Sequence, residues 1–170
     1  MNDPGKAFVE QSRRYLRDDY LPKIRRCLAE LSPDDLWWRP NEASNSVGNL
    51  ILHLAGNVRQ WVVSGIGEEP DIRDRDEEFS TQGGADAVDL LAHLEATLES
   101  VDGVLESLDS NRLGERLVVQ GTEVTVLEAL YHAVEHFSMH VGQIIFVTKL
   151  RTGEDLRFYE VEGGVARKNW

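Results

Sequence analysis

The sequence has little of what secreted proteins and membrane proteins need. Among its 170 residues there is one cysteine, Cys27, so no internal disulfide can form. No apolar run approaches the ~20 residues that a membrane span requires, and the first residues carry no apolar signal-peptide core. These absences lead us to expect a cytoplasmic protein that has no contact with a membrane. Cys27 is expected to be a small buried residue.

Basic residues are also scarce. The chain has 18 Lys and Arg against 30 Asp and Glu, which gives a formal net charge of −12. Nucleic acids and anionic membranes are bound through basic surfaces, so we expect neither as a partner. A hydrophobic content of 41% in a chain of this length is typical of one globular domain, residues 1–170.

Four long stretches carry apolar residues at helical spacing. Three of them begin at residues that cap helices, Asp3, Ser46 and Thr125, and the third stretch along the chain runs from Asp86 to Leu108. The pattern predicts an all-α protein, a four-helix bundle. The second helix should end near residue 65, and the 17 residues 68–84 then form a connection between the second and third helices that is long enough to cross the bundle.

Smaller features complete this prediction. Pro22 lacks an N–H, so we expect a kink or a break near Tyr20 in the first helix. Residues 32–35 predict a short helical turn, and residues 117–124 a small hairpin or an extended crossing. The tail to residue 170 shows no clear periodicity. We expect most carboxylates of the long connection to be solvated, Phe79 to hold it against the fold, and His93 to lie on the surface.

The stretch Glu128–Ile144 carries the strongest functional signal, because it holds three of the five histidines. His132, His136 and His140 follow one another at intervals of four residues, so they share one face of a helix. Thr125 and Glu128 match a capping box, which places the start of this helix at about residue 126. Two imidazoles at this spacing can converge on one metal ion, while a third supports them from further out.

A histidine on a helix is often only a satisfied polar residue, so the position of the stripe matters. On a wheel of 100° per residue, the three histidines share their stripe with Gln143, Ala129 and Ala133. That stripe adjoins the apolar face of the same helix. The histidines therefore point toward the edge of the core, which favours a metal or catalytic role over a purely structural one.

The second helix repeats this arrangement with His53. Its stripe also holds Asn49, Asn57 and Gln60, and it adjoins the apolar residues of that helix. A lone histidine in such a place is more often structural. Its significance rises because the last helix already supplies partners for a shared site.

Two motifs resemble those of the DinB/YfiT-like family of four-helix-bundle proteins. They are Ser46-x-x-Asn-Leu-x-x-His53-Leu and His136-x-x-x-His140-x-Gly-Gln143-Ile, and the second is the more specific. The order of the helices and the Trp-Arg-Pro segment extend the resemblance over nearly the whole chain. The resemblance implies that His53, His136 and His140 bind a divalent metal ion with open positions. His132, Gln143, Asn57 and Gln60 are then candidates to support the ligands or to contact substrate.

The resemblance also implies a range of activities. Members include transferases and isomerases that use glutathione, mycothiol or bacillithiol, and others are described as metal-dependent hydrolases. Three neutral imidazoles form an open, catalytic type of site and suit Zn, Ni or Fe. We therefore expect a metal-dependent transferase that activates a low-molecular-weight thiol for a small-molecule substrate. The alternatives are a metal-dependent hydrolase and a non-catalytic metal-binding stress-response protein.

Assembly is the last expectation from the sequence. Family members are frequently dimers, and two adjacent tryptophans, Trp37 and Trp38, cannot both face the interior of one helix bundle. We expect a homodimer, with one of these tryptophans near the contact.

Overall fold

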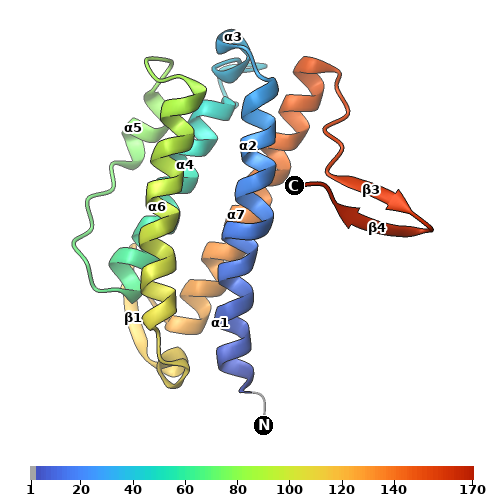
Figure 1. The fold of residues 1–170 in the computed structure, drawn as a ribbon. Helices are drawn as coiled ribbons and strands as arrows, with labels where there is room; N and C mark the ends of the chain where they lie inside the picture. The colour runs from blue at the N-terminus through green and yellow to red at the C-terminus, as the bar shows by residue number, and fades with distance from the viewer. Residues whose placement is uncertain (1–2) are drawn as a thin grey trace.

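Four long helical segments lie side by side and form a bundle (Figure 1). The computed structural model describes residues 3–170. The bundle segments are α1 (Pro4–Arg14) continued by η1 (Tyr15–Tyr20) and α2 (Leu21–Glu30), α4 (Val47–Val58) continued by η2 (Arg59–Ile66), α6 (Ala87–Ser107), and α7 (Val126–Thr152). The predicted all-α four-helix bundle is confirmed.

The first segment is helical throughout, so the predicted break near Tyr20 is wrong, although the helix is irregular at the predicted place. The chain instead widens by one residue per turn over η1, a π-helical stretch in which the N–H of Leu21 donates to the carbonyl of Leu16. This widened turn stands directly before Pro22, which has no N–H to donate and whose ring needs room beside the preceding turn. The irregularity is therefore absorbed within the helix.

Of the other three segments, α4 and α7 begin at their predicted caps, and α6 begins where the sequence placed it. The Ser46 and Thr125 hydroxyls each accept from the backbone N–H three residues later, and the side chains of Asn49 and Glu128 complete both capping boxes. The Asp86 carboxylate caps α6 in the same way. α7 therefore starts at residue 126, as predicted, and it ends at Gly153, whose φ of 72° suits a glycine.

The core forms where the apolar stripes of the four segments meet. α4 packs against α6 and α7, and α7 also packs against α2. The largest fully buried side chains come from all four segments and from the short helix Pro33–Leu36: Phe137, Leu16, Ile24, Leu36, Ile51, Leu54, Ile66, Leu90, Leu94, Leu105, Leu130 and Ile144. Burial of each stabilises the fold by about 1.5–3 kcal/mol, an upper estimate. This packing fixes the distance between α4 and α7, the two helices that carry the histidines.

The connection between α4 and α6 runs back along the length of the bundle, because these two helices point the same way (Figure 1). It contains one short helix that the sequence did not predict, α5 (Arg75–Ser80), which packs against α4. Most carboxylates of the connection are exposed, as expected, and Glu78 is the buried exception. Phe79 is half-buried and does hold the connection against the bundle.

The remaining elements are short. The predicted turn after Ser32 is α3 (Pro33–Leu36), and η3 (Ser110–Gly114) is a 3₁₀ turn. β1 (Arg116–Val119) and β2 (Thr122–Thr125) form the predicted hairpin before α7. β3 (Tyr159–Glu162) and β4 (Val165–Lys168) form a second hairpin that projects from the bundle and was not predicted (Figure 1). Within residues 3–170, no helix is both long and apolar enough to cross a membrane.

Candidate metal centre

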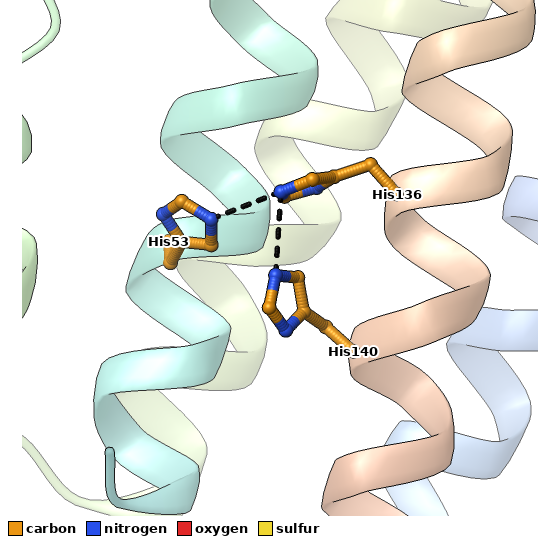
Figure 2. Close-up of side chains that lie close together, drawn as sticks. All are labelled: His53, His136 and His140. Atoms are coloured by element: carbon orange, nitrogen blue, oxygen red, sulfur yellow. Dashed lines mark hydrogen bonds between the residues drawn. The ribbon is translucent and has the colours of Figure 1, made fainter. Parts of the chain in front are cut away.

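Three histidines from two neighbouring helices converge at one point between α4 and α7. His53 comes from α4, and His136 and His140 come from successive turns of α7 (Figure 2). The Nε2 atom of His136 lies 3.1 Å from that of His53 and 3.2 Å from that of His140. The structure thus brings together the three residues that the motifs singled out, each with one nitrogen facing the other two.

The local sequence explains how the rings reach this point. Ala129 and Ala133 of α7 are fully buried on the histidine stripe. Their small side chains leave room for α4 to pack close, so that imidazoles from both helices can meet. Phe137 and Ile144 on the adjoining face are also fully buried, and they fix the rotation of α7 about its axis.

His53 is held from behind by a carboxylate from the long connection. Its Nδ1 lies 2.9 Å from Oε2 of Glu78, and both side chains are less than a tenth exposed. Arg73 binds the same carboxylate twice, from Nε to Oε1 at 2.7 Å and from Nη2 to Oε2 at 2.8 Å. Phe79 packs over the His53 ring, with ring centroids 4.7 Å apart. This surround fixes both the position and the orientation of the imidazole.

The other two histidines have different surroundings. Nδ1 of His140 lies 2.6 Å from the amide oxygen of Gln143, one turn further along α7. Nδ1 of His136 is buried, and no partner for it lies among the residues that the structure describes. The residue at the centre of the cluster is thus the one whose outer nitrogen is left unsatisfied.

The proton positions that follow from these contacts favour a cation at the centre. A carboxylate and an amide oxygen only accept hydrogen bonds, so His53 and His140 carry their protons on Nδ1 and direct Nε2 lone pairs at His136. A proton on Nε2 of His136 can satisfy one of these lone pairs. The other lone pair then has no donor, and if the proton lies on Nδ1 of His136 instead, both N···N contacts set lone pair against lone pair. A metal ion in contact with all three nitrogens removes this repulsion.

The protonation equilibria point the same way. Burial, followed by the proximity of His140 and His53, lowers the pKa of His136 to about 3. Burial also lowers the pKa of His140, although the hydrogen bond with Gln143 opposes this shift. Both imidazoles are therefore neutral at neutral pH, which is the form that binds metals.

The geometry fits a first-row metal ion. Zinc–imidazole bonds of about 2.0–2.1 Å in a tetrahedral arrangement place the ligand nitrogens about 3.3–3.4 Å apart. The two measured Nε2 separations, 3.1 and 3.2 Å, are close to this value. The ligand atoms of the three residues all lie within 4.8 Å of one another, so the cluster can hold one metal ion.

The predicted supporting residues are placed unequally. Gln143 contacts His140 directly. His132 packs against Trp61 with ring centroids 4.1 Å apart, and its ring centroid lies 5.3 Å from that of His136. Gln60 contacts no ligand: its amide oxygen accepts from Arg73 at 2.8 Å and its amide nitrogen donates to Asp71 at 2.7 Å. Asn57 is buried on α4, with no side-chain hydrogen bond to the three histidines among the described residues.

Sequence reasoning missed Glu78 and Arg73, which lie in a charged connection without a motif. One signal was available in Gly56, a glycine in the middle of a helix, three residues after His53. A Cβ at Gly56 would lie 1.9 Å from Oε1 of Glu78. The glycine thus marks the point on α4 where another part of the chain approaches the backbone closely.

Comparisons with known proteins agree with this fold. The model of the DUF1572 family, described as a protein of unknown function, matches residues 3–164. The crystal structure of a conserved protein from Enterococcus faecalis is similar, with a TM-score of 0.73 at 17% identity, over 86% of this chain and 98% of that one. A DinB-like protein, YjoA, from Bacillus subtilis gives a TM-score of 0.65 at 20% identity, over 85% and 93% of the two chains. No curated protein matches. At such identities the likeness concerns the fold alone.

Proposed function

We propose that this chain, which belongs to the DUF1572 family and has the DinB-like fold, binds one divalent metal ion through His53, His136 and His140. The observation that carries the proposal is the convergence of three Nε2 atoms. For His53 and His140, an acceptor at Nδ1 keeps the proton there, so that Nε2 is left with a free lone pair. Imidazole ligands suit Zn, Ni or Fe and do not select among them.

The donor set favours a catalytic site over a structural one. Structural zinc sites close with four protein ligands, whereas three neutral imidazoles leave at least one position open. When bound, such a metal lowers the pKa of a water or thiol that it binds and can polarise a carbonyl group. The chain's own part is to hold three ligands in fixed orientation, with Glu78 and Gln143 keeping two imidazoles in the tautomer that binds metal.

We propose further that the reaction is the transfer of a low-molecular-weight thiol to a small-molecule electrophile. The three ligands are neutral, so the full 2+ charge of the ion remains to attract an anion, and a thiolate is a soft donor that suits Zn or Ni. Cys27, the one thiol of the chain, is fully buried against α7 and cannot compete for this position. The charge balance and the single buried cysteine support a cytoplasmic setting, where such thiols are abundant.

The test begins with the metal. Protein purified without a histidine tag and without added metal should contain about one Zn, Ni or Fe per chain by elemental analysis. Well-folded protein that holds none, and takes up none of the three when they are added, would contradict the proposed function.

The reaction class is tested on the cobalt-substituted protein. A suitable thiol should add a thiolate-to-metal charge-transfer band to its spectrum, and the native protein should consume the same thiol with a panel of electrophiles. If no thiol perturbs the spectrum, and simple esters or amides are hydrolysed in a metal-dependent manner, the protein is a hydrolase. Metal binding without either activity indicates the non-catalytic alternative.

A further inference from the structure

Two groups of opposite character compete for Nδ1 of His53. Oε2 of Glu78 lies 2.9 Å away, and Nη2 of Arg73 lies 3.1 Å away. A carboxylate only accepts a hydrogen bond, so it favours the tautomer with the proton on Nδ1. A guanidinium only donates, so it favours the tautomer with the proton on Nε2. The second tautomer has no lone pair to offer at the centre of the histidine cluster.

The structure resolves this competition by directing the guanidinium to the carboxylate. Arg73 donates from Nε and from Nη2 to the two oxygens of Glu78, and its Nη1 donates to Gln60 at 2.8 Å. The Arg73 and Glu78 side chains are only 4% and 8% exposed, so water does not weaken the pair.

The backbone of α4 is adapted to this pair. Oε1 of Glu78 approaches the helix at Gly56, where a Cβ would lie 1.9 Å from it and 3.2 Å from Nε of Arg73. Any side chain at this position would push the carboxylate away from His53. The glycine leaves room for the carboxylate, the arginine holds the carboxylate in place, and the carboxylate orients the histidine.

We propose that Glu78 is the positioning residue of the metal centre: by accepting from Nδ1 of His53 it keeps the Nε2 lone pair free, and Arg73, which holds Glu78 in place, imposes the opposite tautomer when Glu78 is absent. This inference rests on the proposed metal binding and names the support of that same site. It makes the long connection between α4 and α6 a functional part of the centre. Arg73 therefore helps metal binding only while Glu78 is present.

The test compares Glu78→Ala with the double variant Arg73→Ala/Glu78→Ala. Zinc affinity is measured by competition with a chelator of known affinity, and circular dichroism confirms folding. The single variant should lose about 100-fold in affinity and the double variant about tenfold, the two ends of the range for lost support of a ligand. A double variant that binds no more tightly than the single one, or a single variant with the affinity of the parent, would overturn the proposal.

The tautomer itself gives a readout that does not depend on metal. In metal-free protein, two-bond ¹H–¹⁵N spectra should show His53 protonated on Nδ1 in the parent and on Nε2 in Glu78→Ala. An unchanged tautomer in that variant would refute the role of Arg73. Should the parent bind no metal at all, the proposed function fails, whereas the tautomer experiment still decides whether Glu78 orients His53.

A glycine pair tests the same point without removing any charge. Gly56→Ala should displace the carboxylate and lower zinc affinity about tenfold, although alanine is the better helix former. Gly103→Ala is the matched control, since Gly103 lies in the middle of α6, where an added Cβ would have nothing within 4 Å. The control should raise the melting temperature and leave zinc affinity unchanged. Equal zinc affinity in both variants would contradict the proposed approach of Glu78 to α4.

Discussion

The three central histidines differ in what their Nδ1 atoms contact, and this difference decides how firmly each ring is oriented. His53 has a carboxylate, His140 has an amide oxygen, and His136 has no partner among the described residues. Charge-assisted hydrogen bonds are about twice as strong as neutral ones, so His53 is the most firmly oriented of the three. His136 owes its orientation to packing and to the two rings beside it.

Replacing the histidines one at a time should separate ligands from supports. His53→Ala, His136→Ala and His140→Ala should each abolish tight metal binding, because two imidazoles remain. His132→Ala should weaken binding by about tenfold, the lower end of the range for a supporting residue, because it contacts His136 only through its ring. Elemental analysis and chelator competition measure both effects. A loss in His132→Ala as large as in His136→Ala would mean that the ligands are misassigned.

Cys27 should behave as an inert core residue. Burial raises the pKa of its thiol to about 11, and a hydrogen bond with Thr148 opposes the shift only in part. The thiolate fraction at pH 8 is therefore very small. In native protein we expect no reaction with a disulfide reagent over minutes at pH 8, and full reaction of one thiol per chain in denaturant. Rapid modification of the native protein would show that the thiol is accessible.

Contacts between residues that are close in the sequence could be predicted, whereas contacts between distant residues could not. The spacing of His136 and His140 is local, so a helical wheel sufficed to place them on one face. The contact of Glu78 with His53 spans 25 residues and arises from the path of the connection along α4. One carboxylate among many in a charged stretch carries no local signal of such a contact.

Among the elements, those with capping chemistry were predictable and those with irregular hydrogen bonding were not. The start of α7 follows from Thr125 and Glu128, whose contacts lie within one turn. The π-helical stretch η2 shifts the register by one residue per turn, and hydrophobic periodicity cannot resolve such a shift. Gln60 lies in this stretch, and its amide contacts Arg73 and not the His53 ring. The β3–β4 hairpin was missed because every one of its strand residues is exposed.

An ion-pair cluster between the first segment and α6 gives a prediction for these elements. Asp102 accepts from Arg13 at 2.7 and 2.9 Å and from Arg17 at 3.0 Å. The hydrogen bond from Arg13 is the main reason that the pKa of Asp102 lies below its ordinary value. A carboxyl whose pKa is lower in the folded than in the unfolded protein stabilises the fold above the unfolded value, and this stabilisation is lost as the pH falls through the folded value.

Asp102→Asn should therefore lower the free energy of unfolding at pH 7 by about 1 kcal/mol, a modest figure because the cluster lies near the surface, where water and salt screen it. The difference from the parent should begin to shrink below about pH 4, where the aspartate of the unfolded chain becomes protonated, and should be lost as the pH falls through the lower pKa of the folded protein. Urea unfolding at a series of pH values measures both quantities. A difference that stays constant from pH 7 to pH 3 would show that the effect is not electrostatic.

At the scale of the whole molecule, two surfaces are candidates for a dimer contact: the tryptophans that the sequence suggested and the outer face of α7. Trp37 is half-buried within its own chain, where its Nε1–H donates to the carbonyl of Ala85 at 3.0 Å, and Trp38 packs against the guanidinium of Arg151. The outer face of α7 exposes more apolar side-chain surface than these two tryptophans do. Its large residues, 48–67% exposed, share an arc of about 100° on the helical wheel: Tyr131, Met139, Phe146 and Leu150.

This face has the features of a two-fold contact between antiparallel α7 helices. Gly142 lies at its middle, and an added Cβ there would have nothing within 4 Å, so a second helix could approach the backbone at this point. A two-fold axis at Gly142 relates positions seven residues before and after it, which places Glu135 of one copy opposite Lys149 of the other. The charges at these two positions are opposite and therefore complementary across such an axis.

We therefore predict a homodimer that forms through α7 rather than through the tryptophans. Light scattering at tens of micromolar should give about twice the 19.2 kDa of the chain. Phe146→Glu should give a monomer, because it places a charge in the apolar centre of the contact, whereas Val88→Glu, at an equally exposed site on α6, should leave the dimer intact. Glu135→Lys should weaken the dimer by opposing Lys149, and Glu135→Lys/Lys149→Glu should restore it. A monomeric parent excludes the dimer, while a Phe146→Glu variant that remains dimeric moves the contact to another face.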